Sequence, residues 1–311
     1  MKTVKAVAPY IHPEFLNFKT APYEAWVKLG GQTAKAHYPA RKFHKLAFEH
    51  ELPTLWKSEK DARLRFVSGY SIRFDTFPDY ALYEIIPLVW DCWPDQVENV
   101  ATFFRTHHVK TAVFTSSQTA NRFRDLFPQM NILHITEGVD INLYSKGKDL
   151  EERTIDILEV GRKKANFFNT PLPSGIYHVK TGNFDRTFKT DEEFRAAMAD
   201  TKVTINVPRC DVDKRVAGDV ETLTQRYWEC MLSRVVMVGR APKELTSLIG
   251  YNPVIEWDGH DATHLVIDIL NHIKDYQEIV DKNYETATKQ ASWSIRIQQI
   301  MNYLKEIGFR I

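Results

Sequence analysis

Short apolar runs alternate with amphipathic stretches along most of the chain, and the fold prediction rests on this alternation. Residues 85–90 form an apolar run typical of a buried strand, and residues 95–106 then place apolar side chains on one helical face. Residues 155–160 and 191–199 repeat the same strand and helix patterns in the second half. Because alternating strands and helices are typical of parallel sheets covered by helices, the sequence predicts an α/β protein.

A polar segment separates the two halves of this pattern. Seven of the nine residues in 145–153 are charged or glycine, which is typical of a domain linker. The chain has 311 residues, the usual length of about two domains. We therefore predict two Rossmann-like halves followed by a helical tail.

Charge and cysteine content limit the partners and the compartment. Lys and Arg number 41 and Asp and Glu number 40, so the chain has no global attraction to nucleic acid or anionic lipid. Its three cysteines lie far apart and indicate reduced thiols. No apolar run approaches the roughly 20 residues that span a bilayer. We expect a cytoplasmic protein that binds no nucleic acid, in solution or at the inner face of the cell membrane.

Two glutamates, Glu221 and Glu229, stand eight residues apart in the second half. If Glu221 precedes a helix that contains Glu229, the free N–H groups of Thr222, Leu223 and Thr224 lie between the two carboxylates. A nucleotide diphosphate-sugar fits this arrangement. Its diphosphate would meet the helix end, one carboxylate would bind the ribose hydroxyls, and the other would reach the sugar. A capped amphipathic helix with solvated glutamates has the same spacing, so the spacing alone leaves both interpretations open.

Further elements occur around these glutamates in a fixed order. They are a Gly-Val-Asp turn, a strand ending in Gly-Arg, a helix–strand–Pro unit and a strand–Gly turn with Pro-Lys-Glu-Leu, at residues 138–140, 155–162, 191–209 and 234–245. Together they resemble the GT-B glycosyltransferases of the group 1, or family 4, type, which carry an E-x7-E motif. The resemblance covers roughly residues 131–260.

The resemblance implies a GT-B fold, in which two Rossmann-like domains face a cleft and a C-terminal helix crosses back to the first domain. Residues 1–148 would bind the acceptor, residues 149–285 the nucleotide-sugar donor, and residues 286–311 would form the crossing helix. It also implies a retaining, metal-independent hexosyltransferase that uses a nucleotide-sugar as co-substrate and no cofactor. Its acceptor would be a glycan or lipid-linked glycan in cell-envelope polysaccharide synthesis.

The resemblance also implies roles for single residues. Glu221 would contact the donor sugar, Glu229 the ribose, and Arg162 the diphosphate, where a cation must offset the charge of the departing nucleotide. The family's later Lys-Gly pair is missing, so either Lys163 or Lys164 would supply the second cation. The candidate catalytic residues are Glu221, Arg162 and Asp91, and the candidate donor-binding residues are Gly161, Lys163, Lys164, Arg209, Thr222, Leu223, Thr224, Arg226 and Glu229.

Three of these candidates rest on position rather than on the family motif. Arg226 lies between the two glutamates and could reach the diphosphate or pair with a carboxylate. Arg209 follows Pro208 at the end of a predicted strand. Asp91 ends the strand 85–90, where open α/β sheets place their ligands, and would orient an acceptor hydroxyl or serve as a turn residue.

Other chemistries have little support in the sequence. Residues 211–213 match D-x-D, but the segment reads as a polar loop, so we expect no metal. The alternative to a transferase is a catalytically silent nucleotide- or glycan-binding protein on the same fold. A nucleotide-sugar epimerase would share the fold but not the run from Glu221 to Glu229.

Overall fold

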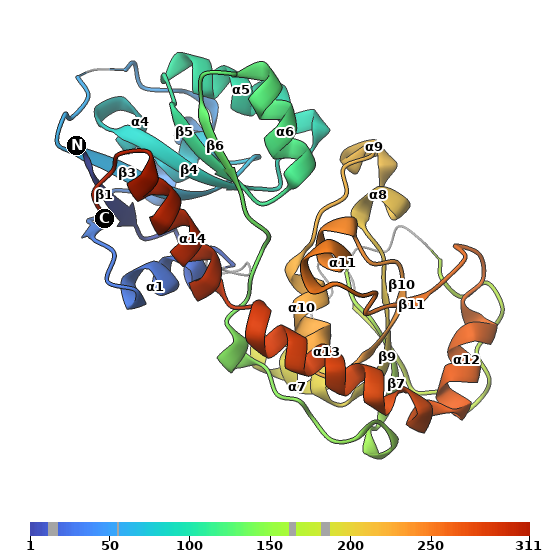
Figure 1. Cartoon of the computed structure of the whole chain (residues 1–311). Coiled ribbons are helices and arrows are strands. Elements are labelled where there is room, and N and C mark those ends of the chain that lie inside the picture. The colour runs from blue at the N-terminus through green and yellow to red at the C-terminus, as the bar shows by residue number, and fades with distance from the viewer. Residues whose placement is uncertain (12–17, 55, 162–165, 182–186) are drawn as a thin grey trace. The chain divides into compact units, whose positions relative to one another are not determined.

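The computed structural model describes residues 1–11, 18–54, 56–161, 166–181 and 187–311, without the side chain of Phe48. By its contacts the chain divides into two compact units (Figure 1). Unit 1 comprises Met1–Glu137, Arg215–Thr222 and Trp293–Ile311, and unit 2 comprises Gly138–Lys214 and Leu223–Ser292.

Unit 1 is built on a parallel sheet with the strand order β2-β1-β3-β4-β5-β6. The strands are β1 (Thr3–Val7), β2 (Thr33–Ala34), β3 (Asp61–Ser68), β4 (Glu84–Trp90), β5 (Thr111–Phe114) and β6 (Asn131–His134). The helices are α1 (Thr20–Lys28), α2 (His44–Glu49), α3 (Ile72–Thr76), α4 (Asp79–Leu82), α5 (Val97–Thr106), α6 (Ser117–Leu126) and α14 (Trp293–Glu306), with most of α9 (Lys214–Ala217).

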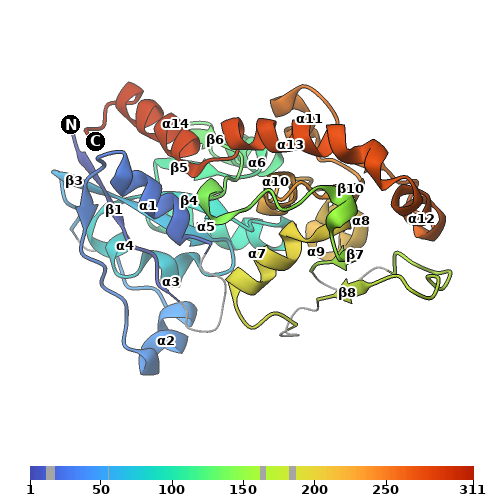
Figure 2. The ribbon, with the colours of Figure 1, turned by 90° about the horizontal axis from the view of Figure 1, so that it is seen from below.

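Alternate residues of the central strands enter two cores, one on each face of the unit 1 sheet. Leu64 and Leu88 pack with α1 and α14, which lie side by side on one face (Figure 2). Val67 and Val89 pack with α3, α4, α5 and α6 on the other face. Because both faces are covered, β4 is apolar at consecutive positions, as expected for a parallel sheet, whereas β3 has Arg63 and Arg65 between its apolar residues.

Unit 2 is built on a second parallel sheet, with the strand order β11-β10-β9-β7-β8. The strands are β7 (Ile155–Glu159), β8 (His178–Lys180), β9 (Thr201–Asn206), β10 (Val236–Gly239) and β11 (Ile255–Glu256). The helices are α7 (Asp191–Ala199), α8 (Arg209–Val212), α10 (Gln225–Leu232), α11 (Lys243–Ile249), α12 (Thr263–Asn271) and α13 (Gln277–Gln290). Short 3-10 turns are Arg41–Phe43, Pro94–Gln96, Ile141–Leu143, Leu150–Glu152 and Ile273–Tyr276.

The two parallel sheets with helices confirm the α/β prediction. In unit 2, Leu158 and Met237 pack with α7, α10, α11 and α13, and Ile157 and Val238 pack with α12 and the start of α13. Gly239 has a φ of +140°, and a Cβ there would lie 2.0 Å from the carbonyl oxygen of Asn206. Glycine is therefore needed where β10 ends beside β9.

The polar segment 145–153 belongs to unit 2 by its contacts. The buried guanidinium of Arg153 donates hydrogen bonds to the carbonyls of Lys146, Lys148, Thr201 and Ser233. These bonds tie the segment to the unit 2 sheet, because Thr201 begins β9.

The C-terminal helix returns to the first unit, as the fold prediction expects. Residues 286–290 still belong to α13 in unit 2, and α14 begins at Trp293 and packs within unit 1. In the described part of the chain, no helix combines the length and the apolar character needed to cross a bilayer.

Candidate functional site

A pocket of about 240 Å³ opens in unit 2 at the edge of the sheet where β7 and β9 end. Val160 directly follows β7, Asn206 is the last residue of β9, and Thr224 directly precedes α10. The carboxyl-end edge of an open parallel sheet is the usual place for a ligand. The pocket is lined by Val160, Phe167, Ile205, Asn206, Val207, Arg209, Val212, Asp213, Thr224, Arg226 and Tyr227.

Two arginines predicted from the sequence line this pocket together. Arg209 begins α8, and its Nη2 atom lies 3.4 Å from Oδ2 of Asp213. Arg226 is the second residue of α10, and its guanidinium lies 5.0 Å from the ring centre of Phe194. Two guanidinium groups at one pocket offer many charged donors to an anionic ligand, and their geometry matches phosphate or carboxylate groups.

Glu229 is held by two partners beside this pocket. Its Oε2 atom lies 2.8 Å from Nη1 of Arg226, and its Oε1 atom accepts a 2.8 Å hydrogen bond from the hydroxyl of Tyr144. The glutamate side chain is only 14% exposed. Glu229 is therefore an oriented, mostly buried carboxylate rather than a solvated one, and Arg226 both pairs with it and faces the pocket.

The environment of Tyr144 keeps its hydroxyl protonated. Burial raises the pKa of Tyr144 far above its usual value, and the carboxylate of Glu229 raises it further. A neutral phenol that donates a hydrogen bond fixes the orientation of the carboxylate. Tyr144 precedes Glu229 by 85 residues, so no motif spacing points to this pair.

Helix α10 begins at Gln225, three residues later than the anion-site hypothesis requires. Thr224 is the N-cap with extended backbone, and the N–H of Leu223 donates a 2.7 Å hydrogen bond to Oε2 of Glu244. The expectation that Thr222, Leu223 and Thr224 present free N–H groups of a helix end is therefore wrong. A carboxylate of α11 already occupies the N–H of Leu223.

Glu221 and Thr222 belong to unit 1, where side chains near the start of α6 hold them. The N–H of Glu221 donates a 2.6 Å hydrogen bond to Oε1 of Gln118, whose amide donates to the carbonyl of Asp219 at 3.2 Å. The hydroxyl of Thr222 donates to the carbonyl of Thr115 at 3.2 Å. The backbone next to the first glutamate is thus fixed to the end of β5 and the start of α6.

Asp91 follows β4 at the carboxyl edge of the unit 1 sheet, as predicted. Its backbone has a φ of +48°, a left-handed conformation that Asp adopts more readily than most residues. The indole N–H of Trp93 donates to its Oδ1 atom at 3.1 Å. The exposed aspartate is therefore oriented by its neighbour, and its part in acceptor binding stays a prediction.

The glycine after β7 leaves room for a ligand. Gly161 has a φ of +110°, and a Cβ there would meet no atom within 4 Å. Beside it, burial alone would raise the pKa of Glu159, but hydrogen bonds from His178 and Lys180 outweigh burial and hold that pKa below its usual value. The predicted cations Arg162, Lys163 and Lys164 lie outside the described residues.

The D-x-D segment is partly helical rather than a loop. Asp211 lies in the single turn α8, and its carboxylate pairs with the guanidinium of Arg240 at 2.8 Å. Asp213 faces Arg209. Among the described residues, no group of three or more His, Cys, Asp or Glu side chains is placed to hold a metal ion.

No protein-family model and no curated protein matches this sequence. Among solved structures, the chain is similar to HepE of Anabaena in complex with UDP-glucose, at 10% identity and a TM-score of 0.58, over 98% of this chain and all of that one. AviGT4, a glycosyltransferase involved in avilamycin A biosynthesis, matches at 10% identity and a TM-score of 0.51, over 98% and 97% of the two chains. TarM matches at 10% identity and a TM-score of 0.51, over 78% of this chain and only 54% of TarM.

These likenesses show a shared fold. HepE and AviGT4 match the chain over almost its whole length and share its two-sheet GT-B fold. The prediction of a GT-B fold is therefore confirmed. Membership of family 4 and the role of the E-x7-E spacing stay predictions.

Proposed function

We propose that this protein is a glycosyltransferase that takes its sugar from a nucleotide-sugar donor bound in unit 2. The observation that carries the proposal is the pocket lined by Arg209 and Arg226 at the ends of β7 and β9. HepE, which shares the fold, has been solved with UDP and with UDP-glucose. A pocket with two arginines suits the diphosphate of such a donor.

The candidate charged residues would have separate parts in this binding mode. The guanidinium groups of Arg209 and Arg226 would bind the diphosphate, assisted by Arg162 and by Lys163 or Lys164. Glu229 would accept hydrogen bonds from the ribose hydroxyls. Its two oxygens keep lone pairs beyond those used by Tyr144 and Arg226, since a carboxylate offers about four acceptor positions.

The proposed reaction retains the anomeric configuration and uses no metal or cofactor. The bond between the sugar carbon and the diphosphate oxygen breaks, and its electron pair leaves with the nucleotide. The acceptor oxygen bonds to that carbon on the same face, and its proton passes to the leaving phosphate. The cations stabilise the charge that develops on the phosphate, and Glu221 contacts the sugar as positive charge develops there.

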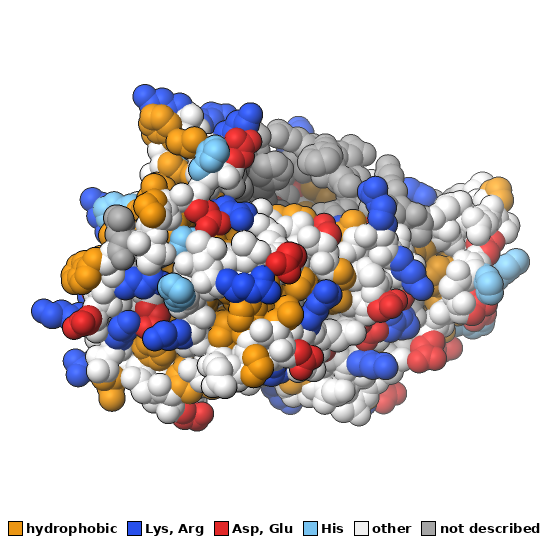
Figure 3. Space-filling model, turned by 90° about the horizontal axis from the view of Figure 1, so that it is seen from above, with side chains coloured by type: hydrophobic (Ala, Val, Ile, Leu, Met, Phe, Trp, Pro, Cys, Tyr) orange, Lys and Arg blue, Asp and Glu red, His pale blue; other side chains and the backbone are white. Residues whose placement is uncertain are grey.

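We propose that residues 1–148 bind the acceptor, a glycan or glycolipid of cell-envelope polysaccharide synthesis, and that a hexose is transferred. The exposed side chains of unit 1 suit binding of an amphiphilic acceptor or contact with a membrane surface. Phe43, Leu46 and Trp56 are exposed, Trp56 by 74%, and Lys42 and Lys45 are exposed among them. In Figure 3, hydrophobic side chains and Lys or Arg side chains are interspersed over unit 1, in the left part of the view.

Substitution of the two glutamates tests the proposal. We expect Glu229→Gln mainly to raise KM for the donor, because ribose contacts are made equally in the ground state and the transition state. We expect Glu221→Gln mainly to lower kcat, because it removes charge next to the reacting carbon. The measurement is donor turnover with UDP-, GDP- and ADP-sugars, with nucleoside diphosphate affinity from calorimetry.

The exposed Glu285→Gln is the matched control and should change neither quantity. Nucleotide binding without any turnover, with or without acceptor glycans, would favour the catalytically silent binding protein. If no nucleoside diphosphate binds at all, the proposed function is wrong.

A further inference from the structure

A second pocket, of about 460 Å³, lies in unit 1 between the segment after β2, the strand β3 and the helix α4. It is separate from the proposed nucleotide pocket, because all its lining residues belong to unit 1. Its volume is within the range of small-molecule sites. The lining residues are Ala34, Lys35, His37, Arg63, Pro78, Asp79, Leu82 and Tyr83.

Arg63 is the main polar group of this pocket. It is the third residue of β3 and is only 7% exposed, and its guanidinium carbon lies 3.6 Å from the ring centre of Tyr83. Its Nη1 atom makes a long 3.4 Å hydrogen bond to the carbonyl of Ala62 and lies 3.6 Å from Asp61. Across the described part of the chain, neither Nε nor Nη2 of Arg63 donates a hydrogen bond to the protein.

Arg63 is a mostly buried side chain that keeps two donors, Nε and Nη2, for a ligand. Burying charged donors without acceptors costs free energy, and such groups in native proteins are generally paired. Stacking on Tyr83 fixes the plane of the guanidinium and leaves its edge for a ligand. A planar, fixed fork of this kind favours two parallel hydrogen bonds to one oxyanion.

The one carboxylate that lines the pocket is already paired. Nη1 of Arg65 lies 2.8 Å from Oδ2 of Asp79. Burial raises the pKa of Asp79, and the charges of Arg65 and of Arg63 act against that rise. Within the described residues, Asp79 makes its ion pair with Arg65 and accepts no hydrogen bond from Arg63, so the donors of Arg63 stay available.

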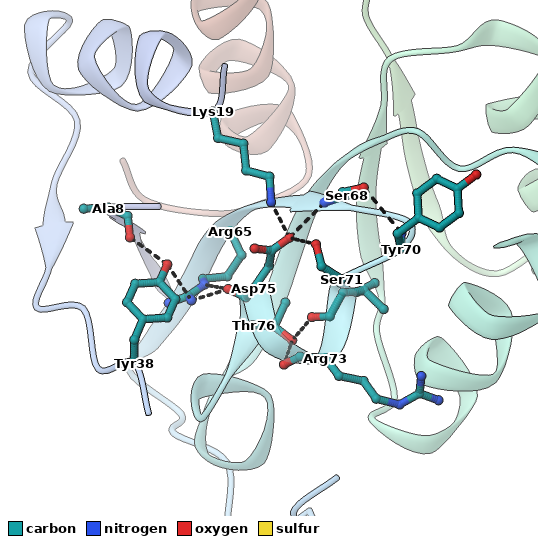
Figure 4. Close-up of polar contacts among 11 residues, drawn as sticks. Ala8, Lys19, Tyr38, Arg65, Ser68, Tyr70, Ser71, Arg73, Asp75 and Thr76 are labelled. Carbon is teal, nitrogen blue, oxygen red and sulfur yellow. Dashed lines mark hydrogen bonds and ion pairs between the residues drawn. The ribbon is translucent and has the colours of Figure 1, made fainter. Parts of the chain in front are cut away.

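The polar network behind the pocket holds Arg65 in place (Figure 4). Nε of Arg65 donates a 2.8 Å hydrogen bond to the carbonyl of Asp75, and Tyr38 accepts a bond from Nη2 at 3.2 Å. The carboxylate of Asp75 accepts bonds from Lys19 and from Ser71 at 2.5 and 2.6 Å. These contacts orient Arg65, which in turn holds the lining residue Asp79.

Positive charge exceeds negative charge around this pocket. Lys35 is an exposed lining residue in addition to Arg63, against the single lining carboxylate of Asp79. Asp61, the other carboxylate near Arg63, also pairs with Lys5 at 3.0 Å. An anion is the ligand that this charge distribution favours.

We propose that this pocket is a binding site for a small organic oxyanion, whose carboxylate or phosphate group is held bidentately by Arg63 and approached by Lys35. Pro78 and Leu82 provide apolar wall for the carbon part of the ligand. The site acts independently of the nucleotide pocket and goes beyond sugar transfer.

Nuclear magnetic resonance of arginine Nε–H groups tests this site directly. Inorganic phosphate and succinate serve as probes, added to the full chain at constant ionic strength. The Nε–H signal of Arg63, assigned by its absence in Arg63→Lys, should shift and saturate at millimolar concentrations with at least one probe. The probe that binds more tightly identifies the oxyanion as phosphate or carboxylate.

Four variants test whether the binding occurs at this pocket. Arg63→Lys lacks the Nε–H reporter group, so its binding is followed by the backbone amide signals of the residues that line the pocket. Because a lysine cannot form the bidentate pair, this variant should bind at least about tenfold more weakly. Lys35→Gln should weaken it several-fold without affecting the buried core, and the exposed Lys45→Gln should leave affinity unchanged. Arg226→Gln, in the other pocket, should also leave it unchanged, so the outcome does not depend on the proposed function. No saturable shift with either probe, or equal affinity in wild type and Lys35→Gln, would overturn the proposal.

Discussion

Arg226 and Glu229 are one helical turn apart on α10, so their side chains lie on the same face and form an ion pair. This ion pair alone does not fix the orientation of the Glu229 carboxylate. The hydroxyl of Tyr144 binds the other oxygen of Glu229 and orients the carboxylate, and Arg226 extends along the pocket wall. A ligand phosphate would therefore meet a guanidinium that is already held in place, which lowers the ordering cost of binding.

Arg226→Gln is expected to weaken nucleoside diphosphate binding about 10- to 100-fold. The reason is that hydrogen bonds to charged groups are worth about 1.5–3 kcal/mol, and about 1.4 kcal/mol is a tenfold change in affinity. The bare nucleoside, which has no phosphate, should lose much less. Calorimetric titration of UDP and uridine, or of the pair whose base binds, measures both.

The surface arginine Arg105, whose ion pair with Glu98 is exposed, gives the matched control Arg105→Gln. That variant should bind both ligands as the wild type does. Equal losses for diphosphate and nucleoside in Arg226→Gln would mean that Arg226 does not contact the phosphates.

At the scale of single elements, α7 and α10 show why some helix starts can be predicted and others cannot. α7 begins at Asp191, because the hydroxyl of Thr190 accepts a 3.0 Å hydrogen bond from the N–H of Glu193 and the Glu193 carboxylate accepts one from the N–H of Lys189. Both signals lie within four residues of each other in sequence. α10 begins late, because the segment before it is bound by distant parts of the chain: the carboxylate of Glu244 accepts from the N–H of Leu223, and the carbonyl of Thr115 accepts from the hydroxyl of Thr222.

Thr190→Ala should therefore destabilise the protein by about 1 kcal/mol, the usual cost of losing an N-cap hydroxyl. Thr190→Ser keeps the hydroxyl and should retain most of the stability. Urea unfolding followed by circular dichroism measures the free energy of unfolding of both variants. If serine is as destabilising as alanine, the hydroxyl is not what stabilises this helix start.

At the scale of the whole molecule, the C-terminal helix α14 completes one hydrophobic core of unit 1. Trp293, Ile297, Ile300 and Leu304 are buried in the same core as Trp26 of α1. The same core contains Val4 of β1, so the core on this face of the unit 1 sheet is incomplete until the last helix is present.

Ile300→Ala is expected to lower the free energy of unfolding by about 2–5 kcal/mol, because the removed side chain leaves a cavity in a fully buried position. Ile295 lies on the same helix but is 40% exposed, and Ile295→Ala should have a much smaller effect. Chemical denaturation of the two variants gives the comparison. Similar losses at both positions would show that α14 is not packed as described.

The sequence by itself determined the α/β class, the strands and helices of the central regions, and the position of Asp91 at a strand end. These features depend on local apolar periodicity and on caps and turns within a few residues, which a single stretch of sequence contains. The resemblance of its motifs to a known family also pointed to the GT-B fold. Position alone pointed to Arg209, after a strand, and to Arg226, between the two glutamates.

Only the tertiary structure decided which side chains meet. It paired Tyr144 with Glu229, gave the N–H of Leu223 to Glu244, and drew the segment 145–153 into unit 2 through Arg153. It also stacked Arg63 on Tyr83 beside a pocket. The partners in these contacts stand 20 to 85 residues apart. Only the packing of helices on a sheet brings such residues together, so no local pattern in the sequence indicates them.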